Sequence, residues 1–440
     1  MARICCRRGV VLSAAVLTAL CGLSGGASAD EVRIVAKAGD MVAGGNGQTV
    51  RVNRFTGFVN SSIPLVSNSG HVLFAAEVTG TGVTSTNNRG LWRASPDGSV
   101  VLVARLGSGA WAPGTSLTFS SLASPMINAN GMCAYLGTFA GTGVTTYNSR
   151  SYWCFDGGAS QMLVRESENA VGFGSGVGLG TISETEWVRS GLGGGLLLFK
   201  SVLTGTGVTA SNNRAIWADG IGSNNSVSLA RAGYAIDEIP SLTCKEPYRV
   251  TNGVGQAMLY ATLTGNGIVT ASATGAPVVP NDQIIWTPGA TQYLARAGDT
   301  APGAASGVRF SSLFTTSTTV RRPQLNNAGH TLFAPTLCDS TGVAVGSGLW
   351  SNRSGSLRPV ARNGDAVVGT GMIIGSPIAP ISTNSFAYSL CGNDSVVFAA
   401  LLEGAGVTYG SNRAIFRSNP DGSLVLLARG GQQAPGAPDG

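Results

Sequence analysis

Short apolar segments separated by glycine-rich turns occur along the whole chain. Val72 to Ala76 and Val100 to Ala104 are apolar at successive positions, not only at alternate ones. This pattern predicts strands whose two faces are both buried. No segment has a long helical period, so the pattern favours an all-β protein.

The apolar segments belong to a repeat whose clearest marker is a short strand that ends in a basic residue. Starting from Lys37, successive markers are 60 to 68 residues apart. They end at Arg105, Arg165, Arg231, Arg296, Arg362 and Arg429. The spacing predicts a single repeat domain at residues 30–440, with six repeats at approximately 38–105, 106–165, 166–231, 232–296, 297–362 and 363–429.

Each repeat has the same internal order of segments. A strand that begins after Gly is followed by a Gly-x-Gly-Val turn such as Gly80 to Val83, a polar loop, and a short strand centred on an aromatic residue. That aromatic residue is Trp92, Trp153, Trp217, Trp286, Trp350 or Phe416. A turn then leads to the arginine strand, and residues such as Thr118 to Leu122 supply a fourth strand. Four strands joined by short turns predict an antiparallel meander.

The repeated meanders also predict how the sheets are assembled. Small sheets that need cover on both faces stack face to face, and radial stacking gives a β-propeller. We therefore expect a β-propeller of six four-stranded blades, with a β-solenoid or serial sandwiches as the alternatives. An extra copy of the marker at Ile34 to Asp40 leaves open whether the ring closes with six blades or seven.

The first 29 residues have the three parts of a secretory signal peptide. Arg3, Arg7 and Arg8 precede an apolar run, and Ala27-Ser28-Ala29 is a small-residue cleavage site. A lipid-acceptor Cys21 or a twin-arginine signal at Arg7-Arg8 would be variants of the same export. No later segment reaches the roughly 20 apolar residues of a membrane helix. We expect a monomeric protein that is secreted, periplasmic or on the cell surface, with no transmembrane segment.

Net charge and cysteine content limit the classes of partner that we expect this protein to bind. The formal net charge of +6 falls to +3 when the three signal arginines are removed, which is too weak an excess for nucleic acid. The five cysteines outside the signal have no metal-binding spacing, and we expect neither metal nor cofactor. Cys133 and Cys154 lie on neighbouring predicted strands, so a disulfide between them is a candidate.

The sequence offers little for catalysis. It has only two histidines, His71 and His330, and both begin the same strand of their repeats. No H-E-x-x-H or G-x-S-x-G motif is present, so we expect no enzyme, although carboxylates scattered over several blades would escape this reading. The Gly-x-Gly-Val turns lack the helix that a phosphate loop needs, and we interpret them as structural turns. The Asn residues of the following loops should bond local backbone.

The six arginines are the candidate binding residues. Facing the axial opening of a ring, they would form a collar that attracts anions. The favoured alternative is that each bonds to backbone carbonyls, or to an acid such as Asp40, Asp299 or Asp365, and ties one blade to the next. A second series is interpreted as structural; it consists of Arg89, Arg150, Arg214 and Arg413.

The repeat motif resembles that of a family of secreted bacterial tandem-repeat proteins of unknown function. The resemblance is carried by segments such as Asn68 to Ala76, Gly205 to Trp217 and Leu294 to Gly303. It implies no catalytic residue. The repeat and the missing active-site motif favour a binding or scaffold module with an unknown protein or glycan partner. The alternatives are a polysaccharide hydrolase or lyase with its site at the propeller mouth, and a purely structural envelope protein.

Function is expected where the repeats differ from one another. Three segments do so: the inserted loop Ala271 to Asn281, the span Asn169 to Gly191 with Glu184, Glu186 and Trp187, and the Cys244-Lys245-Glu246 segment.

Overall fold

The computed structural model of the chain describes residues 33–45, 47–57, 64–107, 117–189, 194–220, 226–236, 239–270, 277–290, 292–315, 322–368, 370–377 and 388–433. The predicted signal peptide lies outside these ranges. Strands and turns make up the described residues, without a helix, which confirms the all-β prediction. The chain divides into two compact units, Met1–Val208 with Trp217–Ser228 and Thr209–Ile216 with Leu229–Gly440.

Three sheets come first along the chain. Sheet 1 consists of β1 (Met41–Gly45), β2 (Gln48–Phe55), β3 (Leu65–Val66), β4 (Val72–Thr79), β5 (Arg89–Ala94) and β6 (Val100–Arg105). Sheet 2 consists of β7 (Thr118–Ile127), β8 (Cys133–Ala140), β9 (Arg150–Phe155) and β10 (Ser160–Arg165). Sheet 3 consists of β11 (Val177–Arg189), β12 (Gly195–Gly205), β13 (Arg214–Gly220) and β14 (Val227–Arg231). The division between the two units passes through β13 and β14.

Three further sheets follow. Sheet 4 consists of β15 (Ala235–Ile236), β16 (Ile239–Thr251), β17 (Ala257–Thr264), β18 (Gln283–Trp286) and β19 (Ala295–Arg296). Sheet 5 consists of β20 (Arg309–Ser312), β21 (Gln324–Leu325), β22 (Thr331–Phe333), β23 (Thr336–Cys338), β24 (Ala344–Ser351) and β25 (Arg358–Arg362). Sheet 6 consists of β26 (Ala366–Val367), β27 (Met372–Ser376), β28 (Tyr388–Leu390), β29 (Val396–Gly404), β30 (Arg413–Ser418) and β31 (Leu424–Arg429).

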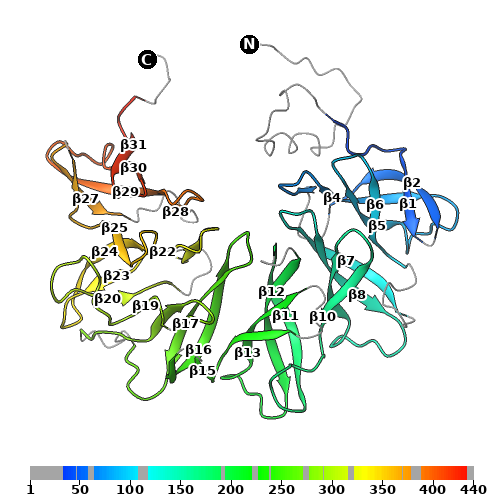
Figure 1. Cartoon of the computed structure of the whole chain (residues 1–440), viewed down its shortest axis with the longest axis horizontal. Helices are drawn as coiled ribbons and strands as arrows, with labels where there is room; N and C mark the ends of the chain where they lie inside the picture. The colour runs from blue at the N-terminus through cyan, green and yellow to red at the C-terminus, as the bar shows by residue number, and fades with distance from the viewer. Residues whose placement is uncertain are drawn as a thin grey trace. The chain divides into compact units, whose positions relative to one another are not determined.

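All six sheets share one antiparallel meander. Sheets 2 and 3 show it in its simplest form, with β7 to β10 and β11 to β14 paired in chain order. The other sheets add short strands at the start or break a strand in two, as β22 and β23 do opposite β24. Figure 1 shows the chain passing through these sheets in order, from β1 in blue to β31 in red. The strands of each sheet lie within one of the six predicted repeat ranges.

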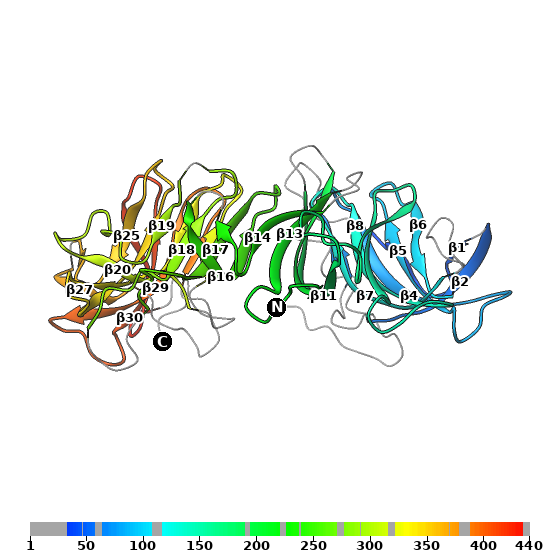
Figure 2. The same ribbon diagram turned by 90° about the horizontal axis from the view of Figure 1, so that it is seen from below.

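Neighbouring sheets within a unit pack face to face. Leu73 and Leu91 of sheet 1 share a buried cluster with Tyr135 and Trp153 of sheet 2, while Phe74 of sheet 1 packs in a separate cluster on the opposite face. Figure 2 shows β4 and β5 beside β7 and β8 within the first unit. The successive apolar residues of the sequence are therefore explained, because alternate side chains enter different cores.

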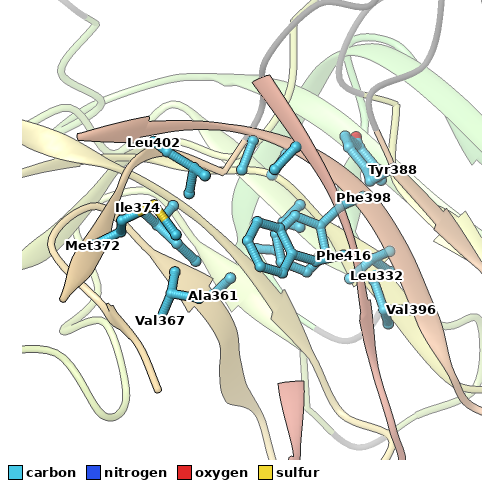
Figure 3. Packing of buried hydrophobic residues seen from close by; sticks show 14 residues of the cluster. Leu332, Ala361, Val367, Met372, Ile374, Tyr388, Val396, Phe398, Leu402 and Phe416 are labelled. Atoms are coloured by element: carbon cyan, nitrogen blue, oxygen red, sulfur yellow. The ribbon is translucent and has the colours of Figure 1, made fainter. Parts of the chain in front are cut away.

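The repeated aromatic position forms the centre of each core. Trp92, Trp153, Trp217, Trp286, Trp350 and Phe416 are all fully buried. Figure 3 shows Phe416 stacked beside Phe398 in sheet 6, with Leu332 of sheet 5 nearby. Burying side chains of this size supplies the largest apolar contribution of each repeat.

The Pro-Asp-Gly-Ser segments form the predicted turns. The Asp97 carboxylate accepts hydrogen bonds from the backbone N–H and the hydroxyl of Ser99, both at 2.8 Å. Gly98 has a φ of 95°, a conformation that residues with a side chain rarely adopt. Asp421 and Ser423 repeat the same bonds before β31.

The candidate disulfide between Cys133 and Cys154 is not formed. The two residues do lie on adjacent strands, but Cys133 pairs with Phe155 and Cys154 pairs with Ala134. Directly opposed residues share a face of the sheet and consecutive residues do not, so the two thiols point to opposite faces. Both are free, and burial raises the pKa of each thiol to about 12.

Candidate functional site

The marker arginines fasten the loop that precedes the third strand of their own sheet. Arg105 at the end of β6 donates from Nε to the carbonyl of Asn87, at 2.6 Å. The same bond recurs in four other sheets: Arg165 to Asn148, Arg231 to Asn212, Arg296 to Asn281 and Arg429 to Ser411. We call this arginine-to-loop bond the arginine clamp. Arg362 differs, since it contacts Asp365 at 3.1 Å and donates to the carbonyl of Gly303.

The loop residue that receives the clamp also folds its own loop. Asn87 Oδ1 accepts the N–H of Thr84 at 2.7 Å, and Asn87 Nδ2 donates to the carbonyl of Gly82 at 3.0 Å. Asn148 makes both bonds in sheet 2, and Asn281 makes both in sheet 4. The backbone role expected for these asparagines is confirmed, and it follows from the ability of Asn to replace backbone partners in a turn.

Sheets 1 and 5 show a second contact, between the end of the sheet and its own beginning. Arg105 Nη1 donates to the carbonyl of Gly44 at 2.7 Å, and Trp92 Nε1 donates to the carbonyl of Ala43 at 2.9 Å. In sheet 5 the equivalent acceptors are Gly303 for Arg362 and Pro302 for Trp350. These carbonyls lie in the same repeat as the arginine, so the bonds hold one sheet together. Marker arginines also contact the following repeat. The Arg362 guanidinium lies 3.1 Å from Asp365, and the backbone N–H of Arg296 donates to Asp299. The backbone N–H of Arg165 donates to Glu168.

The clamp also decides which arginines an external anion could reach. Arg105 is 3% exposed and Arg231 is 6% exposed, and burial lowers the pKa of both guanidinium groups. Arg165 lies over the ring of Phe139, and Arg231 lies over the ring of Tyr234. Arg105 and Arg231 are therefore too buried to belong to a collar of accessible arginines.

The contacts between sheets lie at a turn that sequence reasoning did not single out. It is the turn before the second strand, where a glycine with positive φ stands: Gly70, Gly131, Gly255 and Gly329. His71 of sheet 1 fills the place where a side chain at Gly131 of sheet 2 would lie. Burial, then the charge of Arg93, lowers the pKa of His71. In the second unit, Gln256 of sheet 4 lies against Gly329 of sheet 5 in the same way.

Asp394 of sheet 6 replaces that glycine and keeps a positive φ of 64°. Its carboxylate lies 2.7 Å from His330 Nδ1 of sheet 5 and accepts a bond from Asn326 Nδ2 at 2.6 Å. Arg353 donates to its backbone carbonyl at 2.7 Å. Burial alone would raise the pKa of Asp394, but the bonds from His330 and Asn326 and the charges of His330 and Arg353 lower it. The departure from Gly was visible in the sequence and marks this contact.

The segments in which the repeats differ are partly structural. Trp187 is buried and donates from Nε1 to the carbonyl of Met132, which joins sheet 3 to sheet 2. Glu184 contacts Lys200 at 3.5 Å. Glu246 contacts Arg214, a member of the second arginine series. Residues 271–276 of the inserted loop lie outside the described ranges.

Two exposed tyrosines stand on equivalent loops, and sequence reasoning missed them. Tyr147 is 80% exposed in the loop between β8 and β9, and Tyr409 is 90% exposed in the loop between β29 and β30. Each loop follows a Gly-x-Gly-Val turn and ends at a residue that receives an arginine clamp, Asn148 or Ser411. Their signal was an aromatic residue among Thr, Ser, Asn and Gly.

Within the described ranges, no group of three His, Cys, Asp or Glu side chains is placed to hold a metal ion. The same part of the chain contains no helix long and apolar enough to span a membrane.

Fold and site together define an all-β repeat protein built from antiparallel sheets of four to six strands with clamped loops. The model of the family of unknown function DUF7453 matches residues 22–169 and 108–440, and the chain belongs to this family. No curated protein matches the chain.

Several solved structures are similar at low identity. The β-propeller domain of the trilobed protease from Pyrococcus furiosus is 12% identical, with 87% of this chain and 84% of that chain covered and a TM-score of 0.33. The polysaccharide lyase Uly1 is 10% identical, with 88% and 86% covered and a TM-score of 0.37. The α-L-arabinofuranosidase of Fusarium graminearum is 9% identical, with 83% and 90% covered and a TM-score of 0.29. These values are too low to transfer a fold or an activity.

Removing the most buried clamp should destabilise the protein strongly. Arg105→Ala leaves the carbonyls of Asn87 and Gly44 without their charged donor, and we expect a loss of about 3 kcal/mol in the free energy of unfolding. Arg429→Ala is the matched control, because Arg429 is less buried and should lose about 1 kcal/mol. Urea unfolding of both variants measures the difference, and equal losses would contradict the role assigned to burial.

The contact between Asp394 and His330 should give an acid-sensitive part of the stability. Because the pKa of Asp394 is lowered in the folded protein, its stabilisation is present above the ordinary carboxyl pKa and is lost as the pH falls through the lowered value. Asp394→Asn keeps the shape and tolerates the positive φ, so it should lose about 1–2 kcal/mol at pH 7 and less on acidification. Thermal melting between pH 3 and 7 tests this. A variant with the same acid dependence as the original protein would disprove the assignment.

Proposed function

We propose that the chain is a binding module whose binding surface is formed by the loops after the Gly-x-Gly-Val turns. The observation that carries this proposal is the exposure of Tyr147 and Tyr409 on two equivalent loops. The aromatic side chains at the centre of each sheet, such as Trp153 and Phe416, are buried in the cores. An exposed tyrosine on a fixed loop offers an apolar ring face and a hydroxyl at once.

The loops are fixed before any ligand arrives. In sheet 2, Asn148 holds the loop from inside through Thr145 and Gly143, and Arg165 holds it from the sheet. In sheet 6, Ser411 accepts the N–H of Thr408 and receives Arg429. A binding loop that is already ordered loses little conformational entropy on binding. Tyr, Ser, Thr, Asn and Gly are also the residues that recognition loops use most.

A glycan is the ligand class that suits these loops best. A tyrosine ring can stack on the apolar face of a sugar ring, while hydroxyl and amide groups beside it exchange hydrogen bonds with the sugar hydroxyls. Thr146 and Asn148 flank Tyr147, and Thr408 and Gly410 flank Tyr409. A polysaccharide hydrolase or lyase remains the alternative, and it would add turnover to the same kind of binding.

We also propose that the six sheets are the blades of one β-propeller. In five sheets the residue before the central aromatic residue is buried, as Leu91, Ile216 and Leu349 are. Its counterpart in sheet 6, Ile415, is 39% exposed, and Leu427 beside it is 41% exposed. In a closed ring another sheet would cover this apolar face.

A charge at Ile415 tests closure of the ring. If another sheet covers this face, Ile415→Asp should lose about 3 kcal/mol of stability, comparable to Leu91→Asp in a known core. A change below about 0.5 kcal/mol would contradict closure, because surface substitutions have effects of that size. Melting that depends on protein concentration would instead show that a second copy covers the face.

Replacing the two tyrosines tests the binding surface. Tyr147→Ala and Tyr409→Ala should each weaken binding on a glycan array by about tenfold while leaving the melting temperature unchanged, because neither side chain is packed in a core. Val368→Ala is the control, since Val368 is equally exposed but lies outside these loops.

Three results of this experiment would count against the proposal. Binding that is unaffected by both substitutions would exclude these loops as the surface. Capture of a protein that carries no glycan would show that the ligand is a protein and not a glycan. Cleavage of a polymer by the unmodified chain would favour the hydrolase or lyase.

A further inference from the structure

A small cavity lies in the first unit between sheet 1 and sheet 2. It has a volume of about 130 Å³ and opens to solvent. Thr56, Arg89 and Leu106 line it from sheet 1, and Ser120, Ser121 and Leu122 line it from β7. We call this cavity the Arg89 pocket. The exposed tyrosines do not line it, so its role is separate from the proposed loop surface.

The equivalent place between sheets 2 and 3 holds a carboxylate of the chain itself. Glu166 follows Arg165 in the sequence, as Leu106 follows Arg105. The N–H of Glu166 donates to the carbonyl of Arg150 at the start of β9. The N–H of Leu106 donates in the same way to the carbonyl of Arg89 at the start of β5. The Glu166 carboxylate accepts the N–H of Ile182 at 3.3 Å and lies 3.5 Å from Arg150 Nη1. Burial raises the pKa of Glu166, while the Ile182 bond and Arg150 oppose that shift.

The donor next to Glu166 has a counterpart in the Arg89 pocket. Ile182 lies three residues after Leu179, whose carbonyl accepts the N–H of Ser167. In β7 the carbonyl of Phe119 accepts the N–H of Gly107 in the same way. The residue three positions after Phe119 is Leu122, which is therefore the counterpart of Ile182. An oxygen in the Arg89 pocket would therefore meet the same two groups that hold the Glu166 carboxylate, an arginine guanidinium and a backbone N–H.

One equivalent place in the second unit also receives an oxygen. Gln283 begins β18 of sheet 4, and its Oε1 accepts the N–H of Leu313 at 2.7 Å. Leu313 lies three residues after Phe310, which accepts the N–H of Gly298, so it is the counterpart of Leu122 and Ile182.

Charge at the rim of the Arg89 pocket favours an anion. Glu77 contacts two guanidinium groups, Arg54 at 2.7 Å and Arg89 at 3.6 Å. One carboxylate between two arginines leaves a local excess of positive charge, and half of the Arg89 side chain is exposed to solvent. At about 130 Å³ the pocket is smaller than the roughly 300 Å³ of a site for a whole drug-sized ligand, so it suits an end group.

We propose that the Arg89 pocket binds a carboxylate from outside the chain. Its oxygens take the place that the Glu166 carboxylate occupies between sheets 2 and 3, next to the Arg89 guanidinium and the N–H of Leu122. The hydroxyl groups of Thr56 and Ser121, which line the same pocket, are available to the second oxygen. A uronic acid residue and the carboxyl end of a peptide both carry such a group.

Calorimetric titration of the full chain tests the proposal with small probes. Acetate and glucuronate should bind, and glucose, which has no carboxylate, should not. Tighter binding of glucuronate than of acetyl-alanine would identify a sugar source, and the reverse order a peptide source. Arg89→Ala should weaken binding at least about tenfold. Arg413→Ala removes the arginine at the same repeat position in sheet 6 and should leave binding unchanged.

A second substitution fills the pocket from within. Leu106→Glu introduces a carboxylate at the position that corresponds to Glu166. This carboxylate should occupy the Arg89 pocket, so the variant should not bind acetate and should have a higher melting temperature. This variant keeps the test decisive if Arg89→Ala does not fold. The proposal is overturned if the unmodified chain binds neither acetate nor glucuronate, if glucose binds as well as glucuronate, or if Leu106→Glu binds acetate as the unmodified chain does.

Discussion

The bond from an arginine Nε to a loop carbonyl is the contact that recurs in five of the six repeats. A four-stranded meander leaves its fourth strand at an edge, with one side of its backbone unpaired. The arginine at the end of that strand donates a hydrogen bond to a carbonyl in the loop before the neighbouring strand. The acceptor is Asn87, Asn148, Asn212, Asn281 or Ser411. One charged side chain thereby joins the edge of the sheet to the loop that connects its second and third strands.

Constant and variable positions of the repeat have different roles. The glycine turns, the aromatic centre and the arginine are the same in nearly every repeat, and they build the sheet. The loop tip and the residue after the arginine vary. Tyr147 and Tyr409 occur at the first of these positions, and the difference between Leu106 and Glu166 occurs at the second. Between sheets 2 and 3 the Glu166 carboxylate fills this place, and between sheets 1 and 2, where Leu106 stands, a pocket is left.

Much of the fold could be predicted from the sequence because its signals are local. The repeat length, the four strands and the buried tryptophans follow from spacing and from turn residues such as Pro96-Asp97-Gly98. The failures came from features that spacing alone does not determine. A single step in register put Cys133 and Cys154 on opposite faces. The bond from Arg105 to Gly44 could not be inferred, because Gly44 lies 61 residues away in the chain. The Arg89 pocket could not be inferred, since it depends on bulges in β7 that bring Leu122 beside Leu106.

Hydrogen exchange of the loop amides is the most direct test of the claim that the loops are fixed in the free protein. Thr84, Thr145 and Thr209 lie in exposed loops, and each donates its N–H to an asparagine side chain at 2.7 Å. If the clamps hold, these amides should exchange at least about tenfold more slowly than in an unstructured peptide, and Arg105→Ala should release Thr84 alone of the three. Exchange at the unstructured rate in the unmodified protein would contradict the account.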